Sequence, residues 1–87
     1  MSGMTNIEVF TQPWCPYCSR VVALMTKKGV SFQEIDAPHG SAERTQAMTR
    51  SGRNTMPQVF VDGRSLGGCD DVLALDQSGQ LDLLLTA

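Results

Sequence analysis

Residues 6–28 read NIEVFTQPWCPYCSRVVALMTKK, and this stretch decides the fold. Its first five residues alternate and are rich in β-forming side chains, which predicts a strand over 6–10. Pro16 suits the first turn of a helix, because a helix leaves its first backbone N–H groups unpaired. An apolar face follows and Gly29 is a typical helix stop, so we predict a helix over 16–28. The Cys-x-x-Cys motif therefore lies where a strand passes into a helix.

Outward from this stretch, the chain continues to alternate strands and helices. Residues 30–35 alternate and predict a second strand, and Asp62-Gly63 between two short β-rich runs is a strong hairpin signal. The further elements predicted are a helix over 41–51 that begins at Ser41, strands over 58–61 and 64–66, and a last helical region capped by Asp70 and interrupted near Gly79. The order β-α-β-α-β-β-α predicts an α/β fold, with a four-stranded mixed sheet and three or more helices on its two faces.

The composition is that of a small globular protein. The chain has 87 residues, of which 41% are hydrophobic and 18% charged, so we expect residues 1–87 to form one domain. The net charge is −2 and the basic residues are scattered, which argues against binding of nucleic acid. No apolar run approaches the ~20 residues of a membrane helix, and the first residues lack the pattern of a signal peptide. We therefore expect a cytoplasmic protein, in a compartment where stable disulfides are rare.

Cys15 and Cys18 lie at the start of the first predicted helix, and this position suits redox chemistry. Backbone N–H groups at a helix N-terminus favour negative charge, and cysteine pKa values there fall to ~3.5–7.5. Because the thiolate is the reactive form in disulfide exchange, Cys15 is the predicted nucleophile. Cys18 lies one helical turn further on the same face, where it can resolve a mixed disulfide on Cys15. We expect Cys15 to be the more exposed of the two.

Two other uses of the cysteines compete with redox exchange. A zinc site would need two more ligands, and Cys69 and His39 are the cysteine and histidine that remain. They do not form a second pair at the spacing of a zinc site, so no metal is expected. A structural disulfide across two residues is also disfavoured in a reducing compartment. We expect Cys69 to behave as a small hydrophobe and His39 as an exposed loop residue.

Three stretches, in order along the chain, resemble the signature motifs of dithiol glutaredoxins, most closely the bacterial ones. They are Cys15-Pro16-Tyr17-Cys18, Thr55-Met56-Pro57 and Gly67-Gly68-Cys69-Asp70-Asp71. The resemblance extends over essentially the whole chain and implies a thioredoxin fold, which agrees with the predicted element order. It also implies an enzyme that reduces protein disulfides and glutathione mixed disulfides through Cys15 and Cys18. Glutathione would be a co-substrate, and no further cofactor is implied.

The resemblance also implies a glutathione site. Met56-Pro57 would form a cis-proline loop that turns the Met56 backbone toward the cysteines, so that an extended substrate can pair with it. Backbone N–H groups of Cys69 and Asp70 would bind the α-carboxylate of the γ-glutamyl end, and Asp71, together with Asp70, its ammonium group. The implied binding residues are Gln12, Tyr17, Arg53, Thr55, Met56, Pro57, Gly68, Cys69, Asp70 and Asp71.

One position departs from the family pattern. Many dithiol glutaredoxins have a lysine three residues before the first cysteine, which helps to stabilise the thiolate and meets the glycine carboxylate of glutathione. Here that residue is Gln12. An amide brings no charge, and charge-assisted hydrogen bonds are roughly twice as strong as neutral ones. Arg53 is the first candidate to supply the missing positive charge, and Arg44 is the second. Trp14, next to Cys15, is either a platform for substrate or a packing residue.

Two rival functions stay open at this point. The first is a glutaredoxin-like protein that thioredoxin reductase reduces, and the acidic Gly-Gly-Cys-Asp-Asp stretch argues against it. The second is a carrier of an iron–sulfur cluster bridged between two subunits, with Cys15 and glutathione as ligands. Cluster-carrying relatives tend to have a small residue where this chain has Pro16, which argues against the carrier. We expect a monomer whose partners are glutathione and disulfide-containing or glutathionylated proteins.

Overall fold

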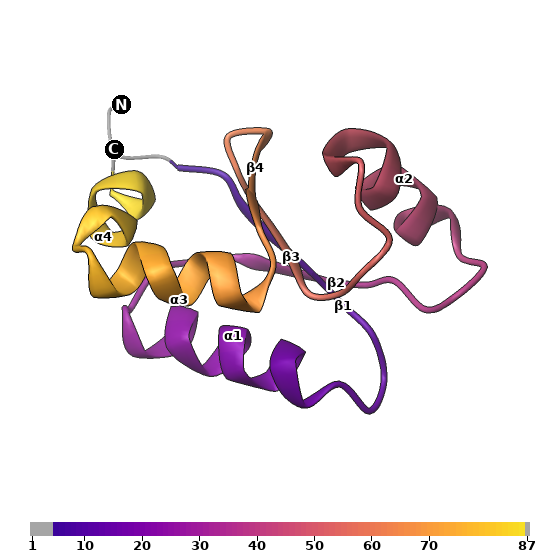
Figure 1. The fold of residues 1–87 in the computed structure, drawn as a ribbon, viewed down its shortest axis with the longest axis horizontal. Helices are drawn as coiled ribbons and strands as arrows, with labels where there is room; N and C mark the ends of the chain where they lie inside the picture. Colours follow the sequence, from indigo (N-terminus) through magenta and orange to yellow (C-terminus); the bar gives the residue numbers. More distant parts are fainter. Residues whose placement is uncertain (1–4, 87) are drawn as a thin grey trace.

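The computed structural model describes residues 5–86, in which strands and helices follow one another in the predicted order (Figure 1). The elements are β1 (Ile7–Thr11), α1 (Pro16–Lys27), β2 (Gln33–Asp36), α2 (Ala42–Ser51), β3 (Gln58–Val61), β4 (Arg64–Gly67), α3 (Cys69–Gln77) and α4 (Gln80–Leu85). The predicted interruption of the last helical region is confirmed, because α3 and α4 are separated by Ser78 and Gly79. No helix within residues 5–86 is long and apolar enough to cross a membrane.

The sheet has four strands in the order β2-β1-β3-β4. β1 pairs in parallel with β2 and antiparallel with β3, and β3 pairs antiparallel with β4. The turn between β3 and β4 is Asp62-Gly63, whose φ angles are +51° and +82°. A two-residue hairpin turn of type I′ needs positive φ at both positions, which Asp and Gly tolerate better than most residues. The predicted mixed sheet and its hairpin are confirmed.

Helices cover both faces of the sheet, as the sequence predicts. Ile7 and Val9 of β1 belong to a buried cluster that also contains residues of α1, α3 and α4. Phe10 belongs to a second cluster on the opposite face, together with Ala47 of α2 and Phe60 of β3. The Phe10 and Phe60 rings pack edge to face, with 5.5 Å between their centroids. In Figure 1, α1 and α3 lie together on one side of the sheet and α2 lies on the other.

Two predicted boundaries differ from the structure by more than one residue, and both have a physical reason. The second strand begins at Gln33 and not at residue 30, since its pairing with β1 begins where Glu8 faces Gln33. Val30 and Phe32 instead pack against the core, which gives the same alternating pattern without strand pairing. The cap of α3 is Gly68 and not Asp70, and the backbone N–H of Gly68 donates to the Asp71 carboxylate at 2.9 Å.

Candidate active site

The two cysteines of the Cys-x-x-Cys motif form a disulfide at the N-terminus of α1. Cys15 is the N-cap residue, and its sulfur accepts a hydrogen bond from the backbone N–H of Cys18 at 3.1 Å. Pro16 occupies the first helical turn, where its missing N–H leaves no gap in the helix. Cys18 is buried and Cys15 is half-buried, so the expected difference in exposure is confirmed. Cys15 is therefore the sulfur that a substrate can reach.

The loop before β3 brings Met56 against the disulfide from the other side. The Met56 carbonyl oxygen lies 3.9 Å from Cys15 Sγ. The Met56–Pro57 peptide bond is cis, as the resemblance implies. Gln58, the next residue, is buried, and its side-chain amide donates to the carbonyl groups of Arg53 and Thr55. These hydrogen bonds hold the loop in place beside Cys15.

Tight packing joins the turn before α3 to the same loop. A Cβ atom on Gly68 would lie 3.3 Å from the Pro57 carbonyl oxygen, and a Cβ on Gly67 would overlap the Asp71 carboxylate. Gly67 also has φ of +98°, a conformation that side chains other than glycine rarely adopt. Gly67 is thus needed for the backbone conformation and for the approach of Asp71, and the missing side chain of Gly68 lets the turn lie close to Pro57. The N-terminus of α3 therefore lies next to the loop, and a helix leaves its first backbone N–H groups without partners inside the helix.

The Asp71 carboxylate stabilises this turn through a backbone hydrogen bond and an ion pair. Its Oδ2 atom accepts hydrogen bonds from Gly68 N at 2.9 Å and from Arg53 Nη1 at 2.7 Å. The Gly68 N–H and then the Arg53 guanidinium lower the pKa of Asp71 below its ordinary value of 3.8. Asp71 is therefore ionised at neutral pH, and a positive and a negative group lie side by side.

These residues line one cleft of about 200 Å³, and they are nine of the ten residues that the resemblance assigns to glutathione. They are Tyr17, Arg53, Thr55, Met56, Pro57, Gly68, Cys69, Asp70 and Asp71. The structure brings them together from α1, the loop before β3 and the start of α3. Gln12 does not line this cleft. That these residues contact glutathione stays a prediction.

Comparison with known proteins identifies the family. The glutaredoxin family model matches residues 7–66. Glutaredoxin 3 of Escherichia coli strain K12 is 51% identical over 82 residues, which cover 94% of this chain and 99% of the relative. The chain belongs to the glutaredoxin family.

Solved glutaredoxin structures have the same fold. The solution structure of glutaredoxin from Brucella melitensis matches with a TM-score of 0.83 at 46% identity, and the match covers 98% of this chain and 92% of that one. The crystal structure of a buckwheat glutaredoxin–glutathione complex matches with a TM-score of 0.82 at 31% identity, covering 97% and 79%. The predicted thioredoxin fold is confirmed. Glutaredoxins are thiol–disulfide oxidoreductases, so this protein is an enzyme of that class with a Cys15–Cys18 redox pair.

Gln12, where many glutaredoxins have lysine, contacts an arginine from α2. Arg44 Nη1 donates to Gln12 Oε1 at 2.6 Å, and the Arg44 side chain is buried. Of the two arginines expected to supply the missing positive charge, Arg44, the second candidate, is the one that contacts Gln12. Arg53 is paired with Asp71 in the cleft, whereas Arg44 lies directly behind Gln12. No local pattern signals this contact, because the two residues are 32 positions apart.

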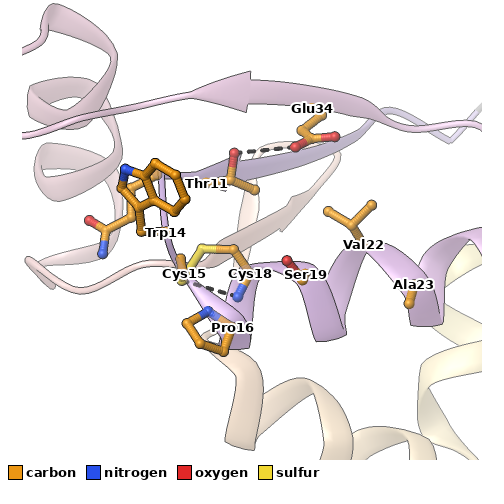
Figure 2. A pocket seen from close by; sticks show the side chains of 10 residues that line it. Thr11, Trp14, Cys15, Pro16, Cys18, Ser19, Val22, Ala23 and Glu34 are labelled. Atoms are coloured by element: carbon orange, nitrogen blue, oxygen red, sulfur yellow. Dashed lines mark hydrogen bonds between the residues drawn. A yellow bond between two sulfur atoms is a disulfide. The ribbon is translucent and has the colours of Figure 1, made fainter.

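A second hollow in this glutaredoxin lies along α1, and we name it the α1 groove. Its volume is about 690 Å³. Its lining residues are Thr11, Gln12, Trp14, Cys15, Pro16, Cys18, Ser19, Val22, Ala23 and Glu34. Figure 2 shows the disulfide and Trp14 at one end of the groove and Val22 and Ala23 at the other. Trp14 is 98% exposed, so the structure excludes a packing role for its ring.

The remaining cysteine and the histidine lie where the sequence predicts. Cys69 is buried at the start of α3, and burial raises the pKa of its thiol. His39 is exposed in the loop before α2. Among residues 5–86, no three side chains of His, Cys, Asp or Glu are grouped so that they could hold a metal ion.

Proposed function

We propose that this glutaredoxin reduces protein disulfides and glutathione mixed disulfides, with glutathione as the electron donor. The observation that carries the proposal is the cleft beside Cys15, where Arg53 and Asp71 pair at 2.7 Å next to the N-terminus of α3. Glutathione has carboxylates at both ends and an ammonium group at one, so a cleft with both charges and free N–H donors suits it. The buckwheat relative, 31% identical, is described as a glutaredoxin–glutathione complex, which supports the same ligand here.

In the proposed complex, the γ-glutamyl end of glutathione lies at the start of α3. The N–H groups of Cys69 and Asp70 donate to its α-carboxylate, and Asp71 with Asp70 faces its ammonium group. The Met56 backbone pairs with the glutathione backbone, while Tyr17 and Thr55 line the cleft. Arg53 and Gln12 are the polar groups offered to the glycine carboxylate. Gly68 and Pro57 give the cleft its shape.

The proposed cycle on a protein disulfide has two halves. The Cys15 thiolate attacks one substrate sulfur, the substrate S–S bond breaks, and the departing substrate thiolate takes up a proton. The Cys18 thiolate then attacks Cys15 Sγ, which forms the Cys15–Cys18 disulfide and releases the second substrate thiol. One glutathione thiolate attacks Cys15 and frees Cys18. A second attacks the bound glutathione sulfur, restores the Cys15 thiolate and leaves glutathione disulfide, so two electrons pass from two glutathiones to the substrate.

Reduction of a glutathionylated protein requires Cys15 but not Cys18. The Cys15 thiolate attacks the glutathione sulfur and releases the protein thiol, and a second glutathione then regenerates Cys15. We therefore expect Cys18→Ser to retain turnover of the glutathione–cysteine mixed disulfide but to lose reduction of insulin disulfides. Cys15→Ser should lose both activities. The assay follows NADPH consumption through added glutathione reductase.

Two outcomes of this experiment would contradict the proposal. Loss of both activities in Cys18→Ser would exclude the single-cysteine branch. If thioredoxin reductase reduced the protein faster than glutathione does, thioredoxin reductase would be the electron donor in place of glutathione. We also propose a monomer in the cytoplasm, where reduced glutathione is available, and gel filtration tests the monomer.

A further inference from the structure

The residues on both sides of Cys15 in the sequence carry exposed rings, which do not pack in the core. Pro13, Trp14, Pro16 and Tyr17 are all exposed, and Trp14 reaches 98%. Trp14 also has φ of +58°, in the left-handed region that bulky residues rarely occupy. Such conformations concentrate at ligand contacts and active sites. Since the Trp14 ring buries nothing in the folded protein, its large apolar surface is available to a partner.

The α1 groove runs from this ring past both reactive sulfurs. Trp14 and Cys15 stand at one end and Ala23 at the other (Figure 2). Ala23 of α1 lies eight residues after the N-cap Cys15, which corresponds to about 12 Å at the helical rise of ~1.5 Å per residue. Roughly four residues of extended chain span that length. The groove therefore has the length of a short peptide segment and begins at the sulfur that substrates must reach.

The groove is separate from the cleft in which the proposed function places the γ-glutamyl end of glutathione. Of the residues proposed to contact glutathione, Gln12 is the one that lines the groove. Nine residues line that cleft, and none of them lines the α1 groove. Among the described residues of the groove, Glu34 carries the one charged side chain, and Thr11 Oγ1 donates to it at 3.4 Å. A carboxylate in a groove whose described residues include no other charged side chain suits a neutral or basic polypeptide and disfavours an acidic one.

We infer that the α1 groove, with Trp14 at its mouth, binds the protein side of the substrate. The occupant is an extended segment of about four residues adjoining the substrate cysteine, neutral or basic in charge. This inference rests on the proposed function, since it assigns the two halves of a protein–glutathione mixed disulfide to two sites. Trp14 acts as a specificity residue that contacts the polypeptide and takes no part in the exchange of sulfurs.

The test compares two substrates with the same reacting bond. One is the mixed disulfide of glutathione and free cysteine, and the other is a glutathionylated peptide of ten residues with lysine near its cysteine. Trp14→Ala should lower kcat/KM for the peptide about tenfold, mainly through KM, and leave the cysteine substrate within about twofold. Trp14→Phe should keep most of the peptide activity. Leu83→Ala, which removes an exposed apolar side chain (71% exposed) from α4, is the matched control and should change neither value.

Each of the other possible outcomes contradicts one part of the role inferred for the α1 groove. An equal loss on both substrates would mean that Trp14 acts on Cys15 itself, and no loss on the peptide would exclude the groove as its binding site. If the wild-type protein turned over neither substrate with glutathione, the proposed function would fail first. A second peptide, with glutamate in place of lysine, should be a poorer substrate of the wild type. Glu34→Gln should remove that difference, and a preference that persists in this variant would contradict the assigned role of Glu34.

Discussion

Arg44 is a buried arginine whose partners are all neutral. Its guanidinium donates to the Gln12 side chain, to the Ala37 carbonyl, and to both the side chain and the carbonyl of Asn54. None of the ion pairs among residues 5–86 includes it. Arginine has only donors, so Gln12 must turn its oxygen toward Arg44 and its NH₂ group away. The arginine thereby orients Gln12, which lies where many glutaredoxins have lysine.

Arg44→Ala should lower the free energy of unfolding by about 3 kcal/mol, because it leaves several acceptors without a donor in a buried place. Urea unfolding followed by circular dichroism measures this difference. Arg20→Ala removes an exposed arginine from α1 and should change the same free energy by less than about 0.5 kcal/mol. Similar effects of the two substitutions would mean that the hydrogen bonds of Arg44 contribute little to stability.

At the scale of elements, the start of α3 depends on the carboxylate of a residue in its own first turn. Asp71, the third helical residue, accepts the N–H of its own N-cap residue, Gly68. The carboxylate also pairs with Arg53 from the loop after α2. The first turn of a helix favours negative charge, so the same group stabilises the helix start and holds the cleft loop.

Asp71→Asn keeps the shape of the side chain and removes its charge. The side chain is 44% exposed, so solvent screening limits the expected loss of unfolding free energy at pH 7 to about 0.5–1 kcal/mol. Because folding lowers the pKa of Asp71 below 3.8, its contribution is complete above that pH and is lost as the pH falls through the lower folded-state value. Urea unfolding between pH 7 and pH 2.5 should show the wild type and the variant converging. A difference that stayed constant down to pH 2.5 would exclude the charge as its cause.

A helix could be predicted from the sequence where nearby residues mark both its start and its end. Features that depend on contacts between distant residues could not be predicted. The helix expected over 41–51 is confirmed because Ser41 caps it at 3.1 Å and Gly52 ends it with φ of +77°. The expected cap at Asp70 is wrong because Gly68 takes that place, in close contact with the Pro57 carbonyl. The redox pair could be predicted because its signal lies in four consecutive residues, 15–18. The contact of Arg44 with Gln12 could not, since it forms only when α2 packs near the end of β1.

At the scale of the whole molecule, the fold separates three cysteines into different environments. Cys15 lies at the open N-terminus of α1, whereas Cys18 and Cys69 are 3% and 6% exposed. Burial raises the pKa of the Cys69 thiol and so keeps it protonated and unreactive at neutral pH. Cys69 therefore lines the cleft without competing with Cys15 for substrate sulfur.

This separation predicts the order in which thiols react. In the reduced protein at pH 7, a brief treatment with iodoacetamide should modify Cys15 and leave Cys69 unmodified, as read by peptide mass spectrometry. In urea, Cys69 should become modified as well, which provides the control for its chemical competence. Modification of Cys69 at the same rate as Cys15 in the folded protein would contradict its buried position.

The exposed Trp14 has a consequence for how the protein can be observed. It is the only tryptophan of the chain, and its ring shares the groove with the Cys15–Cys18 disulfide. A disulfide quenches the emission of an indole close to it, so reduction of the pair should make the protein brighter, and Cys15→Ser should not respond to reductant. The enzyme therefore carries its own optical probe. Its redox state can be followed during turnover without any added dye.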